Sequence, residues 1–184
     1  MERKPEDLEL INQARKGDQQ AFAGLVRRYE SLVARTVIGM LGNVPEADDV
    51  GQEVFIRFYH AMDKFRGDAA LGTYLVRIAI NLSLNELKKR KKVVDITGWQ
   101  GTDYQVEDMM AGEDEPGKAD AHETVHKALE TLEPKFRSVV VLRMIEGYDT
   151  KETAEILEIP LGTVLSRLTR AQKQLRKVLD NVTF

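Results

Sequence analysis

Apolar residues in the first half of the chain recur every three or four positions, which is the spacing of one face of an α-helix. The pattern predicts a first helix in DLELINQARKG that stops at Gly17, and a second helix capped by Asp18. The second helix is expected to end at Gly39, Gly42 and Asn43. Its apolar face consists of Phe22, Leu25, Val26, Tyr29, Val33 and Val37.

Two further helices are expected before the middle of the chain. The third starts at Pro45, because proline suits the first turn of a helix, and Asp48 and Asp49 lie near the positive end of its dipole. Its apolar stripe consists of Val50, Val54, Phe55, Phe58 and Met62. The fourth runs from Thr73 into the basic run LKKRKK and buries Leu75, Ile78, Ala79, Leu82 and Leu87.

The middle of the chain breaks this periodicity. The stretch from Asp95 to Glu123 is rich in Gly and acidic residues, contains Pro116, and has neither a helical nor a strand period. A linker of about thirty residues is long for the interior of one compact domain. The sequence therefore predicts an all-α protein with a first domain at 1–92, a flexible acidic linker at 93–121 and a second domain at 122–184.

Short helices follow the predicted linker. ETVHKALETLEP and KFRSVVVLRMIEG read as two helices, and Gly147 stops the second; VVVL alone would suit a strand, but helical spacing flanks it. Asp149 and Glu152 form an N-cap pair for a helix from Thr150 to Leu157. A short turn then leads to Pro160 and a last helix, which is the layout of a helix-turn-helix.

The last helix has two different faces. Its apolar face consists of Val164, Leu168, Ala171, Leu175 and Leu179. The opposite face carries Ser166, Thr169, Arg170, Lys173 and Lys177. Hydroxyls and cations in this position suit the major groove of DNA, and an ordinary solvated surface is the alternative interpretation.

Composition limits the remaining possibilities. The chain has no Cys, which excludes disulfides and thiolate chemistry, and no apolar run approaches the roughly 20 residues of a membrane span. MERKPEDLEL has no secretory signal core, so we expect a cytoplasmic protein without membrane insertion. The net charge of −3 argues weakly against nucleic-acid binding, but it averages two basic zones and an acidic one.

Several blocks of the sequence resemble a known family. EGYDTKETAEILEIPLGTVLSRLTRAQKQLRKVL is similar to the promoter-reading C-terminal domain of bacterial sigma factors of the extracytoplasmic-function group. KGDQQAFAGLVRRY and ADDVGQEVFIRFYHAMDKFRGDAALGTYLVRIAINLSLNELKKRKK resemble the region-2 domain of that family. The resemblance covers nearly the whole chain except the linker. It implies a protein that binds core RNA polymerase, directs it to promoters and helps to open the DNA, with no covalent chemistry and no cofactor.

The resemblance also assigns candidate residues. It implies polymerase contacts at Asp49, Gln52, Glu53 and Phe55. It implies capture of a single-stranded minus-ten element by Phe65, Arg66, Tyr74, Arg77, Asn81, Lys88 and Lys89. It implies contacts with a duplex minus-thirty-five element at Thr163, Leu165, Ser166, Arg167, Thr169, Arg170 and Lys173. An anti-sigma protein is a further partner that the resemblance implies.

The chemistry of the minus-ten candidates fits an opened strand. Aromatic rings stack on unpaired bases and cations bind phosphates, while the Asn81 amide suits a base edge. Core packing is the alternative for Phe65 and Tyr74. The chain departs from the family pattern at Gly51, Gly72, Tyr74, Thr153, Glu158 and Leu165. Of these, Leu165 occupies a position commonly held by Lys or Arg, which predicts weaker or different minus-thirty-five contacts.

Two other functions compete with this interpretation. HETVH, from His122 to His126, fits the zinc-peptidase pattern H-E-x-x-H, but the only other histidine is His60, in the other predicted domain. A repressor or activator that uses the helix-turn-helix alone is the second rival. It would bind duplex DNA without polymerase, and it leaves DDVGQEVF unexplained.

Overall fold

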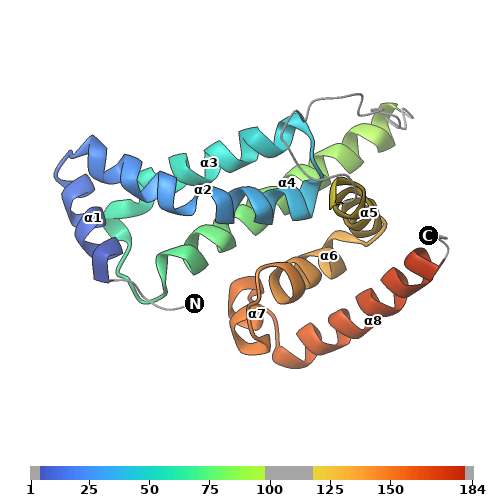
Figure 1. The fold of residues 1–184 in the computed structure, drawn as a ribbon. Helices are drawn as coiled ribbons and strands as arrows, with labels where there is room; N and C mark the ends of the chain where they lie inside the picture. Colours follow the sequence, from blue (N-terminus) through green and yellow to red (C-terminus); the bar gives the residue numbers. More distant parts are fainter. Residues whose placement is uncertain (1–4, 98–117, 181–184) are drawn as a thin grey trace.

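The computed structural model describes residues 5–97 and 118–180, and all regular structure in these two ranges is helical (Figure 1). This confirms the predicted all-α class. The middle of the predicted linker lies outside the described residues. Two helical domains result, which we call the N-terminal domain and the C-terminal domain.

The N-terminal domain is a bundle around one long helix. It contains α1 (Pro5–Arg15), α2 (Gln19–Leu41), α3 (Pro45–Ala61), a 3-10 turn (η1, Met62–Lys64) and α4 (Leu71–Thr97). The α2 helix contacts α1, α3 and α4, and the side chains buried among them include Leu25, Val33, Val54, Phe58, Leu75 and Val76. These positions lie on the predicted apolar faces or next to them.

Local signals set the starts of α2 and α3 as predicted. The Asp18 carboxylate accepts hydrogen bonds from the backbone N–H groups of Gln20 and Ala21, at 2.9 and 3.2 Å. It thereby satisfies donors that have no partner within the helix. Pro45 is the first residue of α3. Both predicted helix starts are confirmed.

The C-terminal domain is a set of shorter helices. It contains α5 (Lys118–Glu130), α6 (Pro134–Val140), one π-helical turn (η2, Val141–Ile145), α7 (Thr150–Leu157) and α8 (Leu161–Asp180). A small apolar cluster holds α5 and α6 against α8 and consists of Leu129, Leu132, Phe136, Val140, Ala171 and the partly buried Leu175. The predicted cap pair is confirmed, since Asp149 and Glu152 each accept the backbone N–H of the other at 2.8 Å.

Some helix ends differ from the sequence prediction. Gly39 lies inside α2, and the helix ends at Gly42, whose φ of 83° favours glycine. The α4 helix begins at Leu71 because Leu71 is buried and the backbone N–H of Tyr74 already bonds to the carbonyl of Ala70. It continues to Thr97, beyond the basic run, and α5 begins earlier than predicted.

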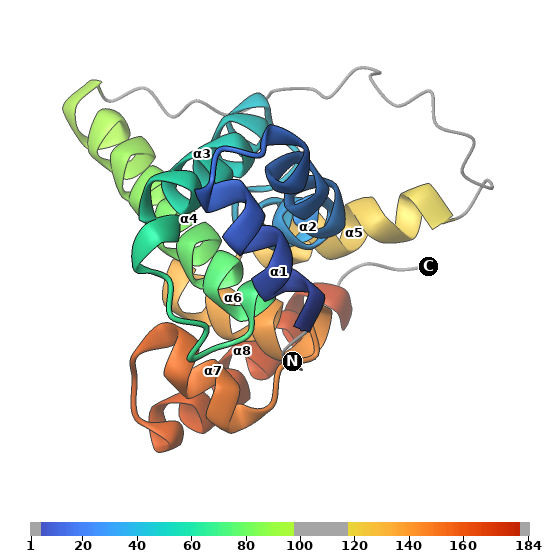
Figure 2. The same ribbon diagram turned by 90° about the vertical axis from the view of Figure 1, so that its left-hand side faces the viewer.

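The two domains pack against each other. The π-helical turn contributes Val141 and Leu142 to the same apolar cluster as α2 and α4, the next loop contributes Tyr148, and α7 contributes Ile156. A Cβ built on Gly39 would lie only 3.0 Å from a methyl group of Val141, so the missing side chain allows the close approach. Figures 1 and 2 show the C-terminal domain covering one side of α2 and α4.

No helix in the two described ranges is long and apolar enough to cross a membrane.

Candidate functional site

The α8 helix presents the predicted polar face to solvent. Val164 and Ala171 are completely buried, and Leu168 and Leu175 are partly buried. The exposed residues on the opposite side are Ser166, Thr169, Arg170, Lys173 and Lys177. The predicted two faces of the helix are therefore confirmed, while the side chain of Leu179 lies outside the described residues.

The hydroxyl groups of this face are bonded to their own helix. Ser166 Oγ donates to the carbonyl of Thr163, and Thr169 Oγ1 donates to the carbonyl of Leu165, both at 3.0 Å. Their oxygens remain available as acceptors, whereas the outward donors of the helix come from cationic side chains. Arg170 and Lys173 are exposed, while Arg167 is partly buried.

The turn before α8 has one unusual residue. Glu158 follows α7 in the left-handed region with φ 54°, and its backbone N–H bonds to the carbonyl of Ala154. Glycine is the usual residue in this conformation, so Glu158 adds a small backbone strain. The next residues, Ile159 and Pro160, lead directly into α8.

The α3 helix exposes both carboxylates and apolar side chains. Asp49 and Gln52 are exposed, and Glu53 is partly buried and accepts a hydrogen bond from Arg57 at 2.8 Å. Ile56 and Tyr59 are 50% and 53% exposed. The remaining candidate of this helix, Phe55, packs partly against the core.

The sequence reasoning missed the apolar part of this face. Ile56 lies beside the predicted stripe, and Tyr59 packs edge-on against the ring of Phe22 at 5.0 Å between centroids. A large apolar side chain next to a filled stripe was the available signal.

The two candidate rings of the minus-ten segment pack together. The Phe65 and Tyr74 rings are 5.1 Å apart, and each lies about 6 Å edge-on from the buried ring of Phe58, at 6.0 and 6.1 Å. Both rings are only partly buried. They therefore take part in the core and also have surface available for stacking.

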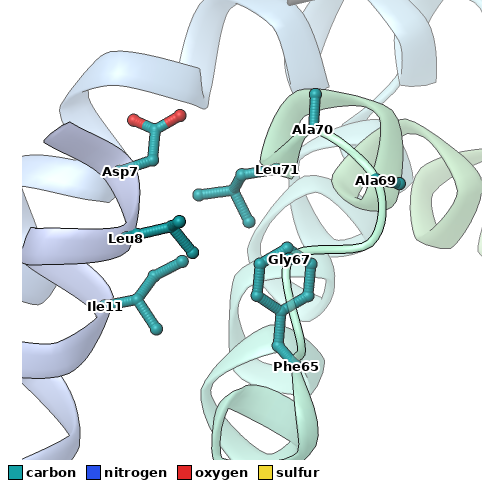
Figure 3. A pocket seen from close by; sticks show the side chains of 8 residues that line it. All are labelled: Asp7, Leu8, Ile11, Phe65, Gly67, Ala69, Ala70 and Leu71. Atoms are coloured by element: carbon teal, nitrogen blue, oxygen red, sulfur yellow. The ribbon is translucent and has the colours of Figure 1, made fainter. Parts of the chain in front are cut away.

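The loop that carries Phe65 is fastened to α1. Arg15 donates to the carbonyl of Met62 from Nε and Nη2, at 3.0 and 2.6 Å, and also to the carbonyl of Phe65. Figure 3 shows a small hollow where the loop faces α1, lined by Asp7, Leu8, Ile11, Phe65, Gly67, Ala69, Ala70 and Leu71. Gly67 has φ 75°, and a Cβ there would lie 3.0 Å from Leu8. These contacts hold the loop against α1.

Four candidates on α4 share one side of the helix. Tyr74, Arg77, Asn81 and Lys88 are spaced by three, four and seven residues, and Asn81 and Lys88 are exposed. Arg66 is exposed in the preceding loop, and Lys89 forms an ion pair with Glu86 at 3.2 Å.

Arg77 is engaged by the C-terminal domain. Its Nη2 donates to the carbonyl of Glu155 at 2.9 Å, and its Nη1 lies 3.4 Å from the Glu158 carboxylate. No sequence pattern predicted this pairing. In this arrangement the guanidinium faces α7.

Comparisons with known proteins match both domains. Residues 25–93 match the family Sigma-70 region 2, and residues 122–175 match Sigma-70, region 4. The chain is 38% identical over 179 residues to the ECF RNA polymerase sigma factor SigW of Bacillus subtilis (strain 168), covering 94% of this chain and 96% of that protein. The chain belongs to the extracytoplasmic-function group of the sigma-70 family.

Other relatives of this sigma factor agree. This chain is 35% identical over 184 residues to the ECF RNA polymerase sigma-E factor of Escherichia coli (strain K12), and the match covers 95% of this chain and 93% of that protein. The structure of CnrH in complex with the cytosolic domain of CnrY has a TM-score of 0.70 at 25% identity, covering 97% of this chain and 99% of that chain. The structure of RpoE from Bartonella quintana has the same fold, with a TM-score of 0.70. It is 22% identical to this chain, and the match covers 88% of this chain and 98% of that chain.

The sigma factor directs RNA polymerase to promoters for transcription initiation, and it is not an enzyme. The zinc-peptidase rival is not supported by this family. Among the described side chains, at 6–92 and 124–178, no group of three or more His, Asp or Glu could hold a metal ion. The side chains of His122 and Glu123 lie outside the described residues.

Proposed function

We propose a division of labour between the two domains of this sigma factor. The N-terminal domain, placed at 1–92, binds core polymerase through Asp49, Gln52, Glu53 and Phe55, and its segment from Lys64 to Lys92 captures the minus-ten strand and assists opening. The C-terminal domain, placed at 122–184, reads the duplex minus-thirty-five element with the outer face of α8.

One observation carries the proposal. Polar and cationic side chains line one side of α4 and the outer face of α8, and these two surfaces belong to different domains. A promoter has two separated elements, so two separate surfaces suit it. The exposed carboxylates and apolar side chains of α3 form a third surface, suited to a protein partner.

The proposed partners indicate where in the cell the protein acts. Core polymerase and promoter DNA are cytoplasmic in bacteria, so we place this sigma factor in the cytoplasm. We also propose a protein inhibitor of the anti-sigma class. CnrH, at 25% identity, was solved with the cytosolic domain of CnrY, which supports a protein partner of this kind.

Strand capture is tested with closed and open templates. A promoter is first selected from a randomised library with reconstituted holoenzyme, and it is then prepared as a duplex and with a pre-formed mismatch bubble. Asn81→Ala removes an exposed amide without creating a cavity. If this amide holds an unpaired base, losing its hydrogen bond lowers transcription from the duplex about two- to tenfold, and the bubble rescues part of the loss.

Two controls sharpen this test. Gln13→Ala removes an exposed amide from α1 and should leave both templates unaffected. Lys substitutions at Asp49 and Glu53 should prevent holoenzyme assembly on every template, because reversed charges oppose a basic partner surface. Equal loss on the duplex and the bubble by Asn81→Ala, with normal assembly, would assign Asn81 to recognition and reject strand capture.

A further inference from the structure

Two leucines are exposed at the start of α8, along the edge between its buried and its polar face. Leu161 and Leu165 are 48% and 49% exposed, whereas Val164 and Ala171 on the inner side are fully buried. The two leucines are four residues apart and are therefore neighbours on the helix surface. In a helix that otherwise separates apolar from polar residues, neither leucine belongs to the two apolar clusters of the described structure.

The surroundings of the pair match DNA. From Leu161 to Leu179 the helix contains no Asp or Glu, and its cations are Arg167, Arg170, Lys173, Arg176 and Lys177. Cations of this density suit a phosphate backbone. The nearby Ser166 and Thr169 hydroxyls donate to backbone carbonyls of α8 itself. The first turns of α8 therefore offer an apolar surface, and the later turns offer charge.

Leucine can distinguish bases in only one way. It has no polar atom, so it cannot hydrogen-bond to a base edge. The major groove presents one apolar group, the 5-methyl group of thymine, and the first residues of a recognition helix are those that approach the base edges. A half-exposed leucine at this place complements thymine and no other base.

We propose that Leu165, with Leu161 beside it, reads the 5-methyl group of a thymine in the minus-thirty-five element. The inference rests on the proposed role of α8. The proposal makes this position specific for thymine. The family pattern commonly has Lys or Arg here, and those side chains would bind phosphate or guanine. Leu165 replaces a polar or electrostatic contact with an apolar one.

The test removes the methyl group and nothing else. In the selected promoter, each thymidine of the minus-thirty-five element is replaced in turn by deoxyuridine on either strand, and holoenzyme binding is measured at fixed salt. We expect one or two positions at which wild-type affinity falls about three- to fivefold, the effect of losing one buried methyl contact. With Leu165→Ala the same replacements should have no effect, and the thymidine promoter itself should bind that much more weakly.

Matched variants distinguish recognition of thymine by Leu165 from a general loss of folding or DNA binding. Leu165→Ala keeps the fold, because the side chain is exposed and Ala favours helices. Val125→Ala shortens an equally exposed apolar side chain on α5, 49% exposed, and should retain the full response to deoxyuridine. Arg170→Ala should weaken binding to thymidine and deoxyuridine promoters by the same factor.

The possible results are distinct. Promoters in which every deoxyuridine replacement binds like thymidine, or a response that persists in Leu165→Ala, would overturn the thymine reading and leave the promoter-binding role of α8 intact. Holoenzyme that binds promoters with no dependence on the minus-thirty-five sequence would overturn both the role of α8 and the reading by Leu165.

Discussion

Arg137 donates a hydrogen bond from Nη1 to the carbonyl oxygen of Met40, at 2.6 Å, and so joins the C-terminal domain to the end of α2. The last carbonyls of a helix have no donor within the helix, and Arg137 supplies one. Its Nη2 donates to the carbonyls of Glu130 and Leu132, at 2.6 and 3.2 Å. The side chain is 6% exposed, and this burial lowers the pKa of the guanidinium from its usual value.

Replacing Arg137 by Met should therefore lower the free energy of unfolding by about 2 to 4 kcal/mol, because buried carbonyls lose their donor. Urea unfolding followed by circular dichroism measures the change. Arg57→Met is the matched control, since Arg57 forms an exposed pair with Glu53, and it should cost less than about 0.5 kcal/mol. Equal stability of the two variants would contradict a structural role for Arg137.

Gly39 should tolerate no large side chain, because Val141 lies against its Cα. We expect Gly39→Leu to lower stability by about 1 to 3 kcal/mol through overpacking. Gly24→Ala, on the same helix, meets nothing closer than 3.9 Å and should raise stability by up to about 1 kcal/mol. Shortening the neighbour with Val141→Ala should recover part of the Gly39→Leu loss, and strictly additive effects would show that the two sites do not touch.

Arg170 and Lys173 are expected to bind promoter phosphates, as exposed cations on the outer face of α8. Each Ala substitution should weaken holoenzyme binding and reduce the slope of log affinity against log salt by about 0.9. Titrations at several salt concentrations measure both quantities. Lys16→Ala, at an exposed position after α1, should leave the slope unchanged. An unchanged slope in both α8 variants would exclude them from phosphate contact.

The cap of α7 should titrate with acid. The backbone N–H of Glu152, above all, holds the pKa of Asp149 below its usual 3.8. A lowered folded-state pKa means that the stabilisation is complete above the unfolded pKa and is lost as the pH falls through the folded value, below about pH 4. Asp149→Asn keeps an acceptor but does not titrate. Its deficit against the wild type should be present at pH 7 and shrink as the pH falls below about 4 in unfolding experiments, and a constant deficit would disprove the linkage.

Local chemistry made much of this fold predictable. Asp18, Pro45 and the Asp149–Glu152 pair each determine a helix start within a few residues, so the sequence located them correctly. The contact of Arg137 with Met40 joins residues 97 positions apart, and the helical spacing of apolar residues cannot predict a contact between such distant positions. Gly39 was expected to end a helix because its contact with Val141 is also distant in the sequence. In the structure Gly39 lies within α2, and its missing side chain lets Val141 pack closely.

The candidate surfaces were predictable to a similar extent. The outer face of α8 follows from helical spacing, because the buried positions Val164 and Ala171 determine which residues remain outside. The exposure of Ile56 and Tyr59 did not follow, since it depends on how far the neighbouring helices extend over α3. The proposed role of each exposed residue depends on its contacts with polymerase or DNA. The spacing of apolar and polar residues in this chain does not reveal those contacts.

Arg77 has a single guanidinium and two competing sets of acceptors. Its bonds to the carbonyl of Glu155 on α7 and to the carboxylate of Glu158, which follows α7, occupy donors that a phosphate would also use. If Arg77 binds minus-ten DNA through these donors, as proposed, that binding competes with the contact between Arg77 and the C-terminal domain, and the two equilibria are reciprocal. Any factor by which α7 weakens DNA binding at Arg77 is the factor by which that DNA weakens the contact between the two domains.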